Sequence, residues 1–382
     1  MHSHPLLWDS RADSFLHDCF DAELHKKTLR SVRDAVLGTL TSARAGVAHI
    51  GRGLAQARGL RPKHAIKQVD RLLSNHRLDL EALAPSWLAF VVGNRTDIVI
   101  AFDWTDFAKD DQSTLALSVI ARDGRATPVL WKTVQRSGIL RNAVEDDLLE
   151  RLRAALPPPI RITLLADRGF ASQAMYLFLR ALEIDFIIRF KSSISIGTSD
   201  GIMTPSAQLI PKHGRTFSLS PACITGDRTE VAIVVLKHAK GMKEAWCLSS
   251  SRSDLKPSAI VNLYGRRFTI EERFRDIKDW RFGMGVSAVR MANPHRRDRL
   301  LLIVALAQTL LQVLGAAGES LGMDRLLKVN TVKTRVHSLY HQGQTYLQLL
   351  PKMPQAEADA LLLHFRRLLH EHATVQKLFA LL

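Results

Sequence analysis

The sequence predicts an α/β fold in which a core of strands and helices carries a β-rich insertion and is flanked by helical regions. Three observations predict it. Short, apolar, β-branched runs alternate with helical periodicity over residues 96–292. A stretch rich in Gly, Ser and Pro, with short strand candidates, interrupts them at about 191–255. Residues 1–95 and 293–382 show helical periodicity and little strand signal, so we expect three regions with these boundaries.

The composition indicates a folded protein that binds a polyanion. The chain has 382 residues, 46% of them hydrophobic, and is long enough to bury a sizeable core. Its formal net charge is +16, and a basic surface gains affinity for nucleic acid by displacing counterions from phosphates. Nucleic acid is therefore the expected partner. The 3 cysteines are widely spaced, which argues against a disulfide framework or a zinc site and favours a reducing cytoplasm, and no signal sequence opens the chain.

The N-terminal region is locally basic, with eight Lys or Arg residues and one acid between residues 41 and 78. The stretch RPKHAIKQVDRLLSN predicts a helix that begins at its proline and carries Lys63, Lys67 and Arg71 on one face. Two helices separated by the turn-prone ARGLRP suggest a helix-turn-helix-like DNA-binding unit, with these three side chains as DNA contacts. The alternative is a solvated basic face.

The core begins with three strand candidates, DIVIAFD, TLALSVIA and TPVLWKTV, which are separated by turn signals. A helix follows at about residues 143–155 and is ended by prolines. The strand ITLLAD, the helix SQAMYLFLRALE and the strand DFIIRF complete the pattern. The order β-β-β-α-β-α-β matches the ribonuclease-H-like fold, in which an antiparallel meander is extended by parallel strands and covered by helices.

Two aspartates follow strand candidates of this core. Asp103 ends IVIAFD and Asp167 ends ITLLAD, so adjacent strands would place them side by side at one edge of the sheet. Their mutual repulsion would be relieved by a divalent cation, and carboxylate oxygens favour magnesium or manganese. The alternative for either residue alone is a turn or a helix cap.

A third acid lies in the stretch YGRRFTIEERFRDIK, which predicts an amphipathic helix. At about 100° per residue, Tyr264, Arg267, Glu271 and Lys278 share one face that borders the apolar stripe. Glu271 would then reach the sheet edge, whereas Glu272 would face solvent. A surface helix with ion pairs such as Glu271 to Arg275 would be the simpler explanation.

The C-terminal region contains the longest apolar run, LLLIVALAQTLLQVLGAAG. Gln308, Thr309 and Gln312 interrupt it, which favours a buried core helix over a membrane span. We expect no membrane association.

These residues together resemble a known family. Tyr264, Arg267, Glu271 and Lys278 have the spacing of the Tyr-Arg-Glu-Lys signature of the insertion-sequence-4 family of DDE transposases. FDWTDF and LLADRGF resemble the two aspartate motifs of that family. The segment KHAIKQVDRLLSN resembles the insertion-sequence-10 group, and the resemblance extends over most of the chain.

The resemblance implies a DNA transposase in which Asp103, Asp167 and Glu271 are catalytic and bind two Mg²⁺ ions, for which Mn²⁺ can substitute. It implies cut-and-paste transposition through a hairpin intermediate, with two-metal-ion hydrolysis and strand transfer. The partners would be the terminal inverted repeats of the element and target DNA, held by a homodimer in a paired-end complex. The C-terminal helices are the candidates for dimerisation, and the protein would act at the nucleoid.

The other signature residues acquire roles from the same resemblance. Arg267 and Lys278 would hold phosphates of the non-transferred strand, and Tyr264 would contact the same backbone. Trp246 resembles the tryptophan on which a flipped base stacks, and Phe268 would support it. Core packing is the alternative for both rings. Two alternative functions stay open, a ribonuclease-H-like nuclease and an inactive protein that only binds DNA ends.

Overall fold

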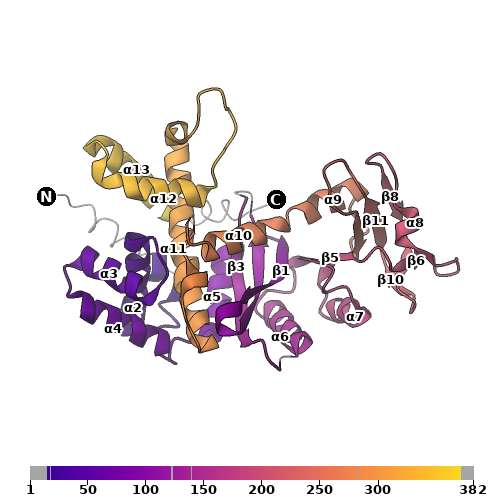
Figure 1. Cartoon of the computed structure of the whole chain (residues 1–382), viewed down its shortest axis with the longest axis horizontal. Coiled ribbons are helices and arrows are strands. Elements are labelled where there is room, and N and C mark those ends of the chain that lie inside the picture. Colours follow the sequence, from indigo (N-terminus) through magenta and orange to yellow (C-terminus); the bar gives the residue numbers. More distant parts are fainter. Residues whose placement is uncertain (1–14, 18, 122–123, 139, 282, 371–382) are drawn as a thin grey trace.

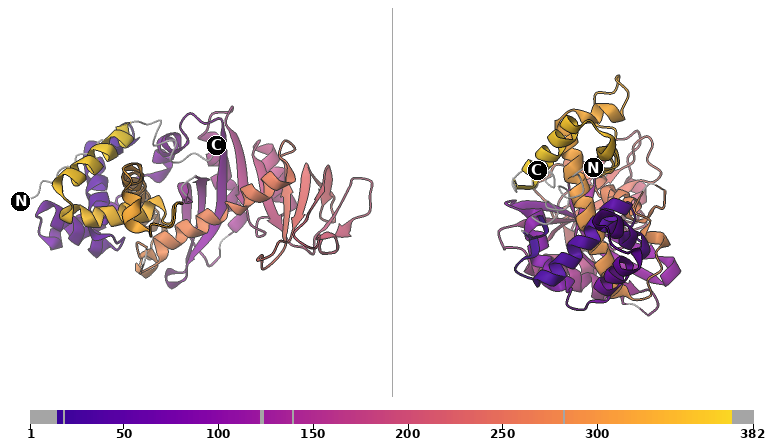
Figure 2. Two further views of the ribbon diagram at one scale, coloured as in Figure 1. Left: turned by 90° about the horizontal axis from the view of Figure 1, so that it is seen from above. Right: turned by 90° about the vertical axis from the view of Figure 1, so that its left-hand side faces the viewer.

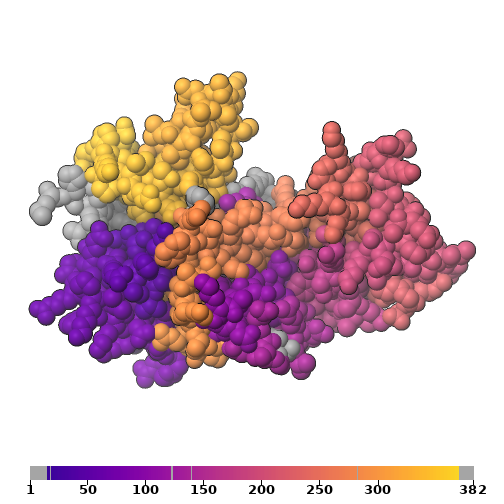
Figure 3. Space-filling view, viewed as in Figure 1, coloured from indigo at the N-terminus to yellow at the C-terminus, as the bar shows by residue number. Residues whose placement is uncertain are grey.

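The structure is a computed structural model, and it describes residues 15–17, 19–121, 124–138, 140–281 and 283–370. The molecule is elongated, with the N-terminal helices at one end, a large sheet in the middle and the insertion at the other end (Figures 1 and 2). The space-filling view shows the C-terminal helices above the N-terminal ones (Figure 3). The active-site candidates of the sequence all belong to the middle of this arrangement or to its border with the insertion.

An 8-stranded mixed sheet, in the order β3-β2-β1-β4-β5-β12-β11-β8, forms the centre of the fold. Its strands are β1 (Asp97–Phe107), β2 (Gln112–Ile120), β3 (Ala126–Gln135), β4 (Arg161–Ala166), β5 (Asp185–Phe190), β8 (Thr216–Leu219), β11 (Ile233–Lys237) and β12 (Trp246–Ser250). The meander β1–β3 is antiparallel, while β4 is parallel to both β1 and β5. The predicted order β-β-β-α-β-α-β is therefore confirmed.

Helices cover both faces of this sheet. They are α6 (Arg141–Ala154), α7 (Gln173–Ala181), α9 (Pro257–Gly265) and α10 (Phe268–Lys278). Because strand side chains alternate between the two faces, each strand contributes to two cores. The even-numbered positions 98, 100 and 102 of β1 belong to the larger apolar cluster, which includes α6. The odd-numbered positions 99 and 101 pack in a second cluster with α9 and α10.

The insertion is less separate from the core than its sequence suggests. Three of its strands, β8, β11 and β12, continue the main sheet, because β12 pairs antiparallel with β5. Four short strands form a second sheet in the order β10-β9-β6-β7, with the short helix α8 beside it. The additional elements are β6 (Ser195–Gly197), β7 (Thr204–Pro205), α8 (Ser206–Leu209), β9 (Ala222–Ile224) and β10 (Thr229–Val231). A single hydrogen-bonded sheet therefore extends from the core into the insertion.

The N-terminal region is helical, as predicted. Its helices are α2 (Lys26–Ser42), α3 (Val47–Arg58), α4 (Pro62–Ser74) and α5 (Leu80–Val92). Helix α3 is capped at its C-terminus by Gly59, whose left-handed backbone (φ +65°) suits a residue without a Cβ, and α4 begins at Pro62. Helices α3 and α4 pack against each other, which gives the expected pair of helices joined by a short turn.

The long apolar run of the C-terminal region forms α11 (Pro294–Ser320), which runs through the middle of the molecule (Figure 1). In the described part of the chain α11 is the one helix long and apolar enough to cross a membrane, but 89% of its most apolar window is buried within the protein. It contacts α2, β3, α12 and α13 and acts as a core helix. The remaining elements are α12 (Leu339–Leu349), α13 (Gln355–His370) and the 3-10 turns η1 (Ala108–Asp110), η2 (Val286–Ala288), η3 (Met323–Leu327) and η4 (Leu350–Lys352).

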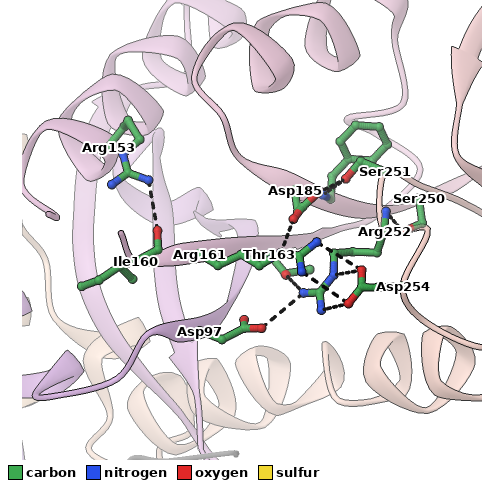
Figure 4. A network of polar contacts seen from close by, with 11 residues as sticks. Asp97, Arg153, Ile160, Arg161, Thr163, Asp185, Ser250, Ser251, Arg252 and Asp254 are labelled. Carbon is green, nitrogen blue, oxygen red and sulfur yellow. Dashed lines mark hydrogen bonds and ion pairs between the residues drawn. The ribbon is translucent and has the colours of Figure 1, made fainter. Parts of the chain in front are cut away.

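An ion-pair network ties the starting ends of the strands together (Figure 4). Arg252 is 6% exposed and donates to Thr163 Oγ1 at 2.7 Å. Its guanidinium also bonds both carboxylate oxygens of Asp254, at 2.8 and 2.7 Å, and lies 3.5 Å from Asp97. Arg161 connects Asp254 to Asp185. This network lies at the edge of the sheet opposite the one that carries Asp167.

Candidate active site

Asp103 and Asp167 occupy neighbouring positions on two paired strands. The parallel register of β1 and β4 ends with Phe102 opposite Ala166, and the residue that follows each of these two is an aspartate. Ala101 and Leu165 face α9 and α10. Because side chains alternate along a strand, Asp103 and Asp167, each two residues further on, point to the same face. The sheet therefore directs both carboxylates toward the same pair of helices.

Asp103 does not end its strand, contrary to the prediction. Strand β1 continues to Phe107. Its pairing with β4 stops at Phe102, but its pairing with β2 continues through Phe107 opposite Gln112. Asp103 thus lies inside a strand on the side where one partner strand has ended, which leaves room beside it for a third element. Asp167 does follow the last residue of β4, as predicted, and its Oδ1 accepts a hydrogen bond of 2.7 Å from the Gly169 amide.

Glu271 reaches this position from α10, and Arg267 joins it to Asp103. Arg267 donates from Nη1 to Asp103 Oδ2 at 3.0 Å and from Nη2 to Glu271 Oε1 at 2.5 Å. The Arg267 residue is only 6% exposed, whereas the Glu271 side chain is 46% exposed. One buried guanidinium therefore bridges a carboxylate of the sheet and a carboxylate of the helix.

The Asp103 carboxyl titrates unusually high. Burial raises its pKa to about 6, Arg267 opposes this shift, and the charges of Asp167 and Glu271 add to it. The three acids are therefore close enough to interact electrostatically. A site that holds several carboxylates with one buried cation has an excess of negative charge that favours cations.

The donor set suits a hard divalent cation, since carboxylate oxygens are the preferred ligands of Mg²⁺ and Mn²⁺. The side chains as they lie do not form a closed cage. Among the described residues no group of three or more His, Cys, Asp or Glu is arranged to hold a metal ion. Arg267 bridges two of the acids, and the acids fit the ion in the chemistry of their oxygen atoms.

The predicted single helix over Tyr264–Lys278 is interrupted. Helix α9 ends at Gly265 and α10 begins at Phe268. The amides of Arg267 and Ile270 bond the carbonyls three residues earlier, which is 3-10 winding, at 3.0 residues per turn, and not α-helical winding. Helical angles counted at a constant 100° per residue therefore do not predict which side chains share a face across this junction.

The consequence is visible at Tyr264, which is buried (1% exposed) and not on the DNA-accessible surface expected for a backbone contact. Its ring packs edge-on against Trp246, with the centroids 5.1 Å apart. Burial raises the pKa of its hydroxyl to about 12. In this structure Tyr264 supports the residues around it and makes no outward contact.

Lys278 lies at the far end of α10, alongside β1. Its Nζ donates to the Asp106 carbonyl at 2.7 Å and to Thr105 Oγ1 at 3.2 Å. Burial lowers its pKa, although the nearby Asp106 opposes this shift. Lys278 and Arg267 therefore contact the same helix-facing side of β1, at Thr105 and Asp103 respectively.

Trp246 and Phe268 form a pair of nearly parallel rings, 5.9 Å apart between centroids with an interplanar angle of 26°. Trp246 is half-buried and Phe268 is 39% exposed. Trp246 begins β12, and it packs against the apolar cluster that faces α9 and α10. It thus lies on the face of the sheet that also carries the acids.

Glu272 was expected to face solvent but is only half-exposed. It pairs with Arg275 at 3.0 Å and lies 3.9 Å from Arg125. Arg125 directly precedes β3 and also bonds Asp276 at 2.6 Å. Glu272 therefore joins a separate ion-pair group, on another side of α10 from the Glu271 contact with Arg267.

The exposed basic face of α4 is as predicted. Lys63, Lys67 and Arg71 are all exposed, while Val69 and Leu73 are buried beneath them. Asp70, the one acid of the helix, is held by Arg296 of α11 at 2.6 Å. The acid of α4 is therefore already paired, and that helix has no other acid to neutralise the three cations.

Two further polar groups were not singled out in the sequence. Glu145 of α6 is 7% exposed and accepts a 2.8 Å hydrogen bond from Trp104 Nε1, and burial raises its pKa. Arg189 of β5 pairs with Glu244 at 2.6 Å, and Glu244 also pairs with Arg168. For Glu145, the sequence offered only the position of its partner Trp104 directly after Asp103.

A cleft of about 600 Å³ lies elsewhere, between α5, β3, α6 and α11. Apolar side chains and a few charged ones line it, among them Lys132, Arg151 and Asp298. None of the three candidate acids is among the lining residues.

A mixed α/β sheet with carboxylates on adjacent strands, in a strongly basic chain, is the arrangement expected of an enzyme that acts on nucleic acid. Residues 95–310 match the family model described as the transposase DDE domain. This match covers more than half of the chain, and the chain belongs to that family. The protein is a transposase of the DDE type. No curated protein matches the sequence.

Proposed function

We propose that the protein is a DNA transposase of the insertion-sequence-4 family, in its insertion-sequence-10-like group, and that it moves its element by cut-and-paste transposition. Asp103, Asp167 and Glu271 are its catalytic carboxylates. The observation that carries this proposal is the register of β1 and β4 together with the bridge from Asp103 through Arg267 to Glu271. The strand order β3-β2-β1-β4-β5 supports a ribonuclease-H-like core for residues 96–292.

The three carboxylates would hold two Mg²⁺ ions, for which Mn²⁺ can substitute. Such ions supply an activated oxygen nucleophile and stabilise the leaving oxygen in phosphodiester attack. The chain itself must orient the DNA strand. Arg267 and Lys278 are suited to hold phosphates of the non-transferred strand, since both cations lie on the acid-bearing face.

A hairpin intermediate is supported by Trp246. Closing a DNA end into a hairpin bends the strand sharply, and a base that leaves the stack gains stability on an aromatic surface. The Trp246 ring is partly exposed and braced by Phe268 and Tyr264. A freed 3′-hydroxyl would attack the opposite strand to form the hairpin, and the reopened end would then join target DNA.

The other regions would bind and pair the DNA ends. Residues 1–95 would bind the terminal inverted repeats through the exposed cations of α4, namely Lys63, Lys67 and Arg71. Residues 293–382 would contribute to a homodimer in a paired-end complex. The protein would work in the cytoplasm at the nucleoid.

The test is a reaction with DNA that carries the inverted repeats flanking the gene, a target plasmid and Mg²⁺. Hairpin ends and joined product are expected. Cleavage without hairpins or joining would favour the ribonuclease-H-like nuclease. Asp103→Ala should abolish cleavage and spare end binding, and equal cleavage by this variant would remove the proposed centre. End binding without any cleavage by the wild type would indicate an inactive end-binding protein.

A further inference from the structure

Arg267 is the buried cation closest to the candidate catalytic acids. Its guanidinium bonds Asp103 at 3.0 Å and Glu271 at 2.5 Å, and only 6% of the residue is exposed. Two aromatic rings flank it, with Phe268 4.9 Å and Tyr264 5.9 Å from the guanidinium carbon. Arg267 sits at the junction of α9 and α10, so its position depends on one turn between two helices.

We propose that Arg267 is the resting counter-cation of the active site, which occupies the space between Asp103 and Glu271 until a DNA phosphate draws it away and a divalent ion replaces it. Arg267 is in this sense a positioning residue that couples metal binding to DNA binding. The inference rests on the proposed function, because it takes these acids as the metal ligands.

The hydrogen bonds at Asp103 support the view that Arg267 and a divalent ion exclude each other from the site. Asp103 Oδ1 accepts from the Trp104 amide at 2.9 Å, and Oδ2 accepts from Arg267. Both oxygens of this partly buried carboxylate therefore already accept a hydrogen bond. Guanidinium groups carry only donors and cannot share a ligand set with a divalent ion without strong repulsion between the two positive charges.

The described residues contain no preformed metal-binding cage, which agrees with a resting state in which Arg267 occupies the site. No three acid, His or Cys side chains lie ready for a metal ion there, although Asp103, Asp167 and Glu271 interact electrostatically. If the arginine left without replacement, partly buried carboxylates would remain uncompensated, which is costly. Movement of the Arg267 guanidinium out of the site should therefore be favourable only when another cation replaces it.

A phosphate is a suitable destination for the arginine. Guanidinium binds phosphate with two parallel hydrogen bonds, as it binds carboxylate. DNA that supplies this acceptor would lower the free energy needed to clear the site, and so would tighten ion binding. By linkage, the ion must tighten DNA binding by the same factor.

The first experiment uses wild-type protein and Mn²⁺, with bound ion measured by electron paramagnetic resonance before cleavage begins. A duplex carrying the flanking inverted repeat should tighten Mn²⁺ binding by about tenfold, within the usual range of coupling between sites. Mn²⁺ should tighten duplex binding, measured by fluorescence anisotropy, by a similar factor. Equal Mn²⁺ affinity with and without the duplex would overturn the inference.

The second experiment compares Arg267→Gln with Arg266→Gln, which removes the same charge from an exposed neighbour. Without DNA, Arg267→Gln should bind Mn²⁺ more tightly than wild type by about tenfold, and its melting temperature should rise more on adding Mn²⁺. Arg266→Gln should resemble wild type in both measurements. An Arg267→Gln protein that binds Mn²⁺ as weakly as wild type would contradict the inference.

Failure of this inference is distinguishable from failure of the proposed function. Wild-type protein that binds no Mn²⁺ even with the duplex, and cleaves nothing, would refute the proposed function itself. Wild-type protein that cleaves DNA but binds Mn²⁺ equally well with and without the duplex would refute only the role of Arg267. The wild-type titration needs no variant, so it remains decisive if Arg267→Gln fails to fold.

Discussion

The rings of Trp246 and Phe268 lie 5.9 Å apart and within 26° of parallel, although one residue begins a strand of the insertion and the other begins α10. A base inserted against this pair would meet an aromatic surface that is already braced. Trp246→Ala should therefore reduce hairpin formation roughly 5- to 150-fold, which corresponds to about 1–3 kcal/mol for base stacking. End binding, which depends on phosphate contacts, should change little.

This prediction can be read directly with 2-aminopurine at the end of the substrate, because its fluorescence rises when the base unstacks and is quenched on an indole ring. Wild-type protein should quench the flipped base, and Trp246→Ala should leave it bright. The same fluorescence signal for both proteins would show that the base finds another surface. Phe268→Leu, which keeps an apolar side chain beside Trp246, should give an intermediate effect.

Glu271 and Glu272 form a matched pair of neighbouring carboxylates on α10. Glu271→Gln should lower the cleavage rate by roughly 10³-fold, because it removes a charge worth several kcal/mol at a metal centre. Glu272→Gln should stay within a few-fold of wild type. It loses only ion pairs to Arg275 and Arg125, and exposed pairs of this kind contribute about 1 kcal/mol or less.

Single-turnover cleavage of a labelled end gives both rates. Similar losses in the two variants would mean that the acids of α10 act through the helix as a whole and not through the Arg267-linked site. Circular dichroism at the same temperature would show whether either variant has unfolded.

The network of Figure 4 predicts a stability difference between two arginines that share Asp254. Arg252→Ala should destabilise the fold by about 2–4 kcal/mol, because the arginine is 6% exposed and its loss leaves Thr163 and Asp97 without their cation. Arg161→Ala should cost less than about 1 kcal/mol, since its side chain is 43% exposed. Urea denaturation curves give both values. Equal losses would show that burial does not set the strength of this network.

A buried acid outside the candidate site, Asp298, predicts how stability depends on pH. Asp298 of α11 accepts a 2.9 Å hydrogen bond from the Thr133 amide, and burial raises its pKa to about 7. The folded protein therefore binds a proton here that the unfolded chain releases near pH 3.9, as expected for an ordinary Asp. Between these values the folded state holds more protons, so the contribution of Asp298 to stability should fall as pH rises from about 4 to about 7.

Asp298→Asn keeps a hydrogen-bond acceptor for Thr133 and removes the titration. Its melting temperature should vary less than that of wild type between about pH 4 and pH 7. The comparison of the two proteins cancels all other titrating groups. Parallel curves would mean that the Asp298 carboxyl is ionised in the folded protein at neutral pH.

Local sequence predicted the elements of the core well. The run ITLLAD forms β4 and leaves Asp167 at its end, because six consecutive residues decide the strand and its boundary. Asp103 illustrates the limit. Its strand continues to Phe107 because of hydrogen bonds to β2 on one side, and a single-strand pattern contains no information about where each partner ends.

The sequence predicted three acids for the candidate site but not the contacts that connect them. Spacing indicated that Glu271 could reach the sheet, but the 3-10 turn before α10 buries Tyr264 and directs Arg267 onto Asp103, 164 positions earlier. Such contacts depend on how separate elements pack. The same holds for Arg252 and Thr163, which are 89 positions apart and have no distinguishing pattern in the sequence.

Strand β12 pairs with β5, and β5 pairs with β4, so Trp246 and Asp167 are carried by one uninterrupted hydrogen-bonded surface. A hinge between the insertion and the core would require breaking these ladders. The sheet consequently holds Trp246 and Asp167 at a fixed separation. In the proposed reaction, a DNA end that contacts both residues at once must therefore deform to do so.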